Sequence, residues 1–142
     1  MKRVKCKQKV YLRISFSALI AYILILFFFA VLIRDAREIS SVKLDLFWGY
    51  NNPPKYIYRD NILNIASFVP IGLMTGMVFK RYRIIKALLV GMLVSLIIEF
   101  SQLFWHRGTF DVDDLFNNAV GALTGGLIVA LMVKVRDFRK GL

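Results

Sequence analysis

A group of acidic and amide side chains, with one arginine, surrounds the connection between the last two long apolar segments of the chain. A carboxylate placed inside a membrane helix costs about 2.5–3.5 kcal/mol, so it normally has a partner or a function. Side chains of these types can hold a polar head group, act as a general base or contribute oxygen ligands to a cation. The group consists of Glu99, Gln102, Arg107, Asp111, Asp114 and Asn118.

The spacing of these residues places them on two helix faces. Residues three, four or seven positions apart lie on the same side of a helix. Glu99 and Gln102 therefore share a face with Ser95, and Asp114 shares a face with Asn118 on the next segment. The two polar faces can meet at one end of a helical bundle.

The elements that must position these side chains are predicted to be membrane helices. The chain is 58% hydrophobic with a mean hydropathy of +0.59, which is not the composition of a soluble or disordered protein. About 20 apolar residues cross the hydrocarbon as a helix, and long runs without alternation satisfy their backbone as helices. The sequence predicts an all-α bundle of four transmembrane helices, at about residues 14–33, 61–79, 84–105 and 115–133.

The distribution of basic residues predicts the orientation. Six lie before the first span, four in the connection between the second and third, and four after the last span. Cytoplasmic segments carry the excess of Lys and Arg, so both termini, as basic tails 1–13 and 134–142, are expected in the cytoplasm. The polar group then faces outward, and Asn64 near the start of the second span joins it.

The predicted topology and the attraction of basic residues to anionic lipid account for the net charge of +11. Nucleic acid is therefore not expected to be a binding partner. One histidine and one cysteine argue against a zinc site, and no cofactor or metal is expected. The segment 34–60 is predicted to be an outer loop whose aromatic residues, Trp48 and Tyr50 among them, lie along the membrane surface.

Several ordered blocks lie within roughly residues 44–131. They are Asn64-x-x-x-Phe68-x-Pro70-x-Gly72, Glu99-x-x-Gln102, Arg107, and Asp111-x-x-Asp114-Leu115-x-x-Asn118-x-x-Gly121-x-x-x-Gly125. In combination, these blocks resemble the signature of the VanZ-like membrane proteins. The resemblance implies a plasma-membrane protein of a Gram-positive bacterium, connected with the cell envelope and with resistance to glycopeptide or lipoglycopeptide drugs such as teicoplanin. It implies no settled chemical mechanism.

A purely structural interpretation of the same residues remains open. Asp111 and Asp114 can cap the last helix, and Asn61 and Asn64 can cap the second. Glu99 can form an ion pair with Arg107, and Asn118 can bond to Gln102. Asp113 is expected to be a solvated charge, and the glycines Gly72, Gly76, Gly121 and Gly125 are expected to allow close helix packing.

Three functions from different classes follow. In the first, the outward polar group binds an envelope lipid, such as a cell-wall precursor lipid, or a lipid-tailed drug. In the second, the protein is an intramembrane enzyme acting on a lipid-linked substrate, with Glu99 or Asp111 as general base and Arg107 stabilising negative charge. The third is a small proton-coupled exporter, which would require access from both sides. The first function fits the outward placement and the resemblance. Catalysis ranks lower because the sequence lacks an obvious nucleophile elbow, a phosphate loop or a His-rich ligand set. The oligomeric state is not determined by the sequence.

Overall fold

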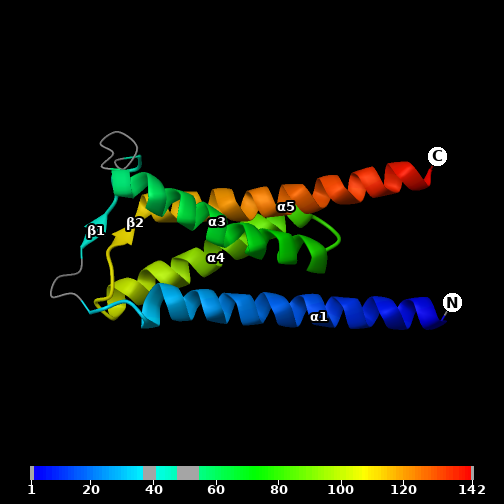
Figure 1. The fold of residues 1–142 in the computed structure, drawn as a ribbon, viewed down its shortest axis with the longest axis horizontal. Helices are drawn as coiled ribbons and strands as arrows, with labels where there is room; N and C mark the ends of the chain where they lie inside the picture. The colour runs from blue at the N-terminus through cyan, green and yellow to red at the C-terminus, as the bar shows by residue number, and fades with distance from the viewer. Residues whose placement is uncertain (1, 37–40, 48–54, 142) are drawn as a thin grey trace.

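Four long helices form the fold in the computed structural model, which describes residues 2–36, 41–47 and 55–141 (Figure 1). Each helix is long and apolar enough to cross a membrane. The protein is therefore an all-α membrane bundle, as predicted. Its helices are α1 (Lys2–Phe27), extended by the π-helix η1 (Phe28–Leu32), then α3 (Lys55–Val78), α4 (Arg83–Phe104) and α5 (Val112–Lys140).

The helices alternate in direction, so both termini lie at one end of the bundle (Figure 1). The opposite end, which we call the strand end, contains residues 41–47 and 106–111. There, β1 (Val42–Lys43) pairs in parallel with β2 (Phe110–Asp111). This pairing connects the segment after α1 to the turn before α5. The sequence did not predict these strands, because two residues are too short to show an alternating pattern.

Small residues allow α3 and α5 to pack closely. A Cβ atom at Gly72 would overlap the carbonyl of Ala122, and one at Gly121 would overlap the carbonyl of Ile65. Close backbone approach at small residues is a common means of helix association in membranes, so these contacts confirm the predicted packing role of the glycines. The apolar core beside them includes Phe68, Ile71, Val94 and Ile98.

The helices extend beyond the predicted spans. The α1 helix begins at Lys2 and α5 continues to Lys140, because Lys, Arg and Gln are good helix formers whether or not they lie in lipid. The α3 helix begins at Lys55, within the segment predicted to be loop. The expected position of Trp48 and Tyr50 along the membrane surface lies outside the described residues.

The α1 helix lies at the side of the bundle and contacts it mainly through its second half. Between Lys9 and Leu32, where burial is described, only Leu19 and, in η1, Val31 are buried. The Tyr22 hydroxyl donates a hydrogen bond to the carbonyl of Ser67 in α3 at 2.9 Å. The end of α1 nearest the polar residues is thus the part fixed to the other helices.

Candidate functional site

A cavity of about 210 Å³ lies near the strand end, between the end of α1 and helices α3, α4 and α5. One part of its wall is apolar, with Leu26, Phe29, Phe68 and Ile98. The remainder is polar and comes from α3, α4, α5 and the segment that follows η1. The polar residues lining the cavity are Arg34, Asn64, Ser67, Glu99, Gln102, Asp114 and Asn118.

Five of the predicted site residues therefore meet in one place. Glu99 and Gln102 come from α4, Asp114 and Asn118 from α5, and Asn64 from α3. The predicted residues Arg107 and Asp111 are not among the residues lining the cavity. Both lie directly beside it and bond to its surroundings.

The Glu99 side chain is only 2% exposed, and its carboxylate accepts a hydrogen bond from the backbone N–H of Asp111 at 3.1 Å. Asp114 accepts one from the amide nitrogen of Asn64 at 2.6 Å. Glu99 and Asp114 interact electrostatically with each other, and Arg34 interacts with both. Because a buried carboxylate is costly without partners, these contacts explain how two acids remain near one cavity.

Gln102 and Arg107 hold the end of η1. The amide nitrogen of Gln102 donates to the carbonyl of Ala30 at 3.0 Å, and Arg107 donates to the carbonyls of Leu32 and Arg34. The last carbonyls of a helix lack partners within it, so they are ready acceptors for such side chains. These bonds take the place of the expected Glu99–Arg107 ion pair.

The amide side chains make bonds between helices rather than helix caps. The nitrogen of Asn118 donates to the Ser95 hydroxyl at 2.8 Å, not to Gln102 as expected. Asn117, which the sequence analysis did not select, donates to Asn61 at 3.0 Å. Asn61 and Asn64 therefore join α3 to α5, and the capping prediction for them is wrong because α3 begins at Lys55.

Two amide oxygens beside the cavity have no hydrogen-bond partner within the described part of the chain. They are Oε1 of Gln102 and Oδ1 of Asn118, in side chains that are 3% and 4% exposed. A buried polar atom without a partner costs about 1–3 kcal/mol, so most such atoms are satisfied in a folded protein. Both side chains line the cavity, so a hydrogen-bond donor bound there is a possible partner for these oxygens.

Asp111 is the N-cap of α5, as predicted, and its carboxylate accepts the N–H of Asp113 at 2.9 Å. Burial raises the pKa of Asp111, while the Asp113 N–H and Lys43, 4.0 Å away, act in the opposite direction. Asp113 is not the solvated charge that was expected. It is 5% exposed and accepts the N–H of Phe47 at 2.6 Å, because the 41–47 segment folds over the start of α5.

Among the described residues, no group of three or more His, Cys, Asp or Glu side chains is arranged to hold a metal ion. The ionisable groups in the lining of the cavity are two carboxyl groups and one guanidinium.

Comparison with known families identifies the chain. The sequence matches the VanZ/LLP1 family model over residues 14–133. This chain belongs to the VanZ/LLP1 family. It is also similar to Protein VanZ of Enterococcus faecium, with 28% identity over 83 residues. The aligned region covers 58% of this chain and 52% of that protein, so the similarity spans about half the length of the relative. No solved structure matches the chain.

Two polar residues that line the cavity, Arg34 and Ser67, were not selected by the sequence analysis. Arg34 was counted only as the first residue of the outer loop, yet it lines the cavity. A Cβ atom added to Gly108 would lie 2.9 Å from the Gln102 oxygen and 3.3 Å from a guanidinium nitrogen of Arg34, so both side chains border this glycine. The position of Arg34 could have indicated its involvement. It is a cation directly after the first predicted span, at the same end of the bundle as Glu99 and Asp114.

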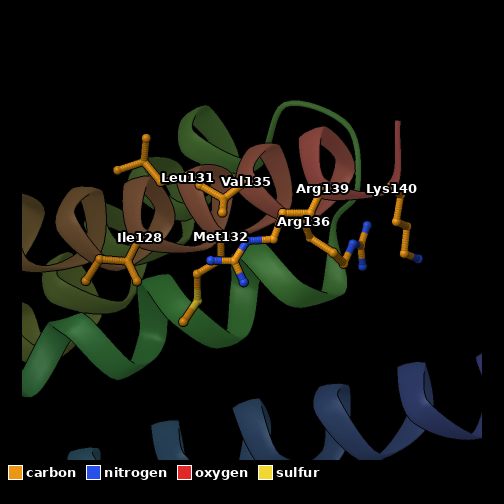
Figure 2. Close-up of a pocket in the computed structure, with 7 residues that line it drawn as sticks. All are labelled: Ile128, Leu131, Met132, Val135, Arg136, Arg139 and Lys140. Atoms are coloured by element: carbon orange, nitrogen blue, oxygen red, sulfur yellow. The ribbon is translucent and has the colours of Figure 1, made fainter. Parts of the chain in front are cut away.

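A larger hollow of about 620 Å³ lies near the C-terminus of this VanZ/LLP1 chain (Figure 2). Its lining comes from α5 alone, with apolar residues followed by Arg136, Arg139 and Lys140. An apolar helix face that ends in basic residues is typical of a helix leaving the hydrocarbon at an anionic leaflet. The smaller cavity is the better candidate site, because residues from four segments converge on it.

Proposed function

We propose that this VanZ/LLP1 protein contributes to resistance against teicoplanin-type glycopeptides by binding an envelope lipid, or another lipid-tailed ligand, in the polar cavity. The link to these drugs comes from the family resemblance. The observation that carries the binding proposal is the convergence of Glu99, Gln102, Asp114 and Asn118 with Arg34 on one cavity beside an apolar wall.

The size of the cavity favours a head group over a whole antibiotic. Pockets that enclose drug-sized molecules have volumes of about 300–1,000 Å³. A cavity of about 210 Å³ is smaller than this range. A lipid head group is a suitable occupant, whereas the peptide scaffold of a glycopeptide would remain outside. We therefore propose that the protein binds an envelope lipid and acts on drug sensitivity through that lipid.

The apolar wall supports a ligand with an acyl chain. Leu26 and Ile98 line the cavity together with Phe29, and the Phe29 side chain is 60% exposed on the outside of the bundle. In a membrane, that outer surface contacts lipid. An acyl chain can continue from the cavity across Phe29 into the bilayer without leaving an apolar environment.

The distribution of basic residues supports a multi-pass protein of the bacterial plasma membrane, with both termini in the cytoplasm. In this orientation the strand end faces outward. A head group from the outer leaflet, or one delivered from the cell wall, then reaches the cavity directly.

Drug susceptibility of cells tests the proposal. In cells whose own gene has been deleted, Glu99→Gln and Asp114→Asn are expected to fail to restore teicoplanin resistance at equal protein levels. Loss of one charged hydrogen-bond partner costs about 1.5–3 kcal/mol, which corresponds to about tenfold or more in ligand affinity.

Asp137→Asn is the matched control, because Asp137 is an exposed acid at the far end of α5 that pairs with Arg136. Cells carrying it should remain as resistant as wild type. A glycopeptide without an acyl chain, tested in parallel, shows whether the effect depends on a lipid tail in the drug. Full resistance with both cavity variants would contradict the proposed function.

A further inference from the structure

The amide side chains that line the polar cavity use their nitrogens within the protein, while two of their oxygens have no partner among the described residues. The amide nitrogens of Asn64, Gln102 and Asn118 each donate to a protein atom. The oxygens of Gln102 and Asn118 have no partner among the described residues. The orientation of Gln102 is fixed by its contacts, because the Ala30 carbonyl can only accept and must face the NH₂ group. Its oxygen is therefore left for a donor.

The charges at the cavity favour the same kind of ligand. Glu99 and Asp114 interact with each other and share one cation, Arg34. A positively charged ligand group beside these two carboxyl groups is therefore favoured. A primary ammonium supplies that charge together with three N–H donors. A trimethylated ammonium supplies the charge without any donor.

We infer that the cavity binds a phospholipid whose head group ends in a primary amine, with the ammonium among Glu99, Gln102 and Asn118 and the phosphate at Arg34. This inference rests on the proposed lipid-binding function and specifies its ligand class.

Arg34 is suited to the phosphate because its side chain is exposed while it also lines the cavity. A planar guanidinium can form two parallel hydrogen bonds with phosphate oxygens. Gly108 lies between Arg34 and Gln102, where a side chain would crowd both. The ammonium and phosphate of one head group therefore have binding groups on neighbouring parts of the wall, with Leu26 and Phe29 beside them for the acyl chains.

The test is a titration of purified full-length protein in detergent with phosphatidylethanolamine, its N-methyl and N,N-dimethyl derivatives, and phosphatidylcholine. These lipids have the same phosphate and acyl chains and differ in the number of N–H donors. Native mass spectrometry measures the fraction of protein with bound lipid. We expect binding to weaken stepwise, with phosphatidylethanolamine about tenfold or more tighter than phosphatidylcholine.

Variants assign the preference to the cavity. Glu99→Gln and Asp114→Asn should each reduce the difference between the two end members of the series to about twofold or less. Asp45→Asn should keep it, because Asp45 is an exposed acid of the 41–47 segment that does not line the cavity. Circular dichroism and size-exclusion chromatography check that each variant is folded. If one of the two cavity variants does not fold, the other still tests the assignment.

The outcomes separate this inference from the proposed function. Equal binding of all four lipids, or a preference that survives both cavity variants, would overturn the primary-amine assignment, while drug susceptibility tests the proposed function separately. Soluble phosphoethanolamine carries the head group without acyl chains. If it binds as tightly as the lipid, the occupant is a soluble amine phosphate and the assignment to a phospholipid is wrong.

Discussion

Replacing Gly125 with alanine is expected to prevent α5 from packing normally against α3. The added Cβ atom would overlap the carbonyl of Val69 and lie 2.6 Å from the backbone nitrogen of Leu73 and 2.9 Å from the carbonyl carbon of Gly72. All three are backbone atoms, so no side-chain rotation relieves the contact. Overpacking typically costs 1–3 kcal/mol, and we expect a loss of about 3 kcal/mol in the free energy of unfolding here.

Such a loss is a large share of the 5–15 kcal/mol that stabilises a typical domain. Thermal unfolding of the detergent-solubilised protein, followed by circular dichroism, measures it. Gly141→Ala is the control, because the nearest atom to a Cβ there is 3.7 Å away, which is ordinary contact. Equal melting temperatures for Gly125→Ala and wild type would show that the α3–α5 interface is not as close as described.

Replacing Arg34 with glutamine is expected to abolish the contribution of this protein to teicoplanin resistance. Arg34 is the cation that interacts with both Glu99 and Asp114. Its removal leaves the two acids without that cation and removes the proposed phosphate partner. Charge-assisted bonds contribute about 1.5–3 kcal/mol, so lipid affinity should fall by about tenfold or more.

Susceptibility assays in the gene-deleted cells measure this effect. Arg34→Lys should restore part of the resistance, because lysine keeps the charge but loses the planar two-bond geometry of arginine. Arg59→Gln serves as the control. Arg59 is an exposed arginine near the start of α3, at the same end of the bundle as Arg34, and it does not line the cavity. If Arg34→Gln and Arg59→Gln behave alike, Arg34 has no special function.

Helix periodicity was sufficient to predict which polar residues of α4 and α5 gather. Glu99, Gln102, Asp114 and Asn118 share the expected faces, and the cavity contains all four. Apolar length likewise predicted the four membrane helices. Both predictions depend on repeating local patterns, which a single sequence displays directly.

The contacts that connect distant segments were not predictable in this way. Arg107 donates hydrogen bonds to carbonyls at and just after the end of η1. Any helix end with free carbonyls could accept these bonds, so the sequence does not indicate which one Arg107 contacts. Asp113 is buried because the 41–47 segment packs over it. No local sequence pattern around Asp113 predicts this contact. Arg34 joins the site only because α1 ends beside α4, which is a consequence of tertiary packing.

The central claim is that the polar residues enclose a cavity open to the outside of the cell, and thiol labelling of Ser67→Cys tests it most directly. Ser67 lines the cavity, and replacing its hydroxyl with a thiol changes the side chain little. The background carries Cys6→Ser, because Cys6 is the single cysteine of the chain. Ala66→Cys is the control, since the neighbouring Ala66 is exposed on the outside of the bundle, where lipid would surround it.

A small charged thiol reagent that does not cross membranes is added to intact cells. We predict that Ser67→Cys reacts and that Ala66→Cys does not. Reaction of Ser67→Cys only after the cells are made permeable, or no reaction at all, would contradict an outward-facing polar cavity.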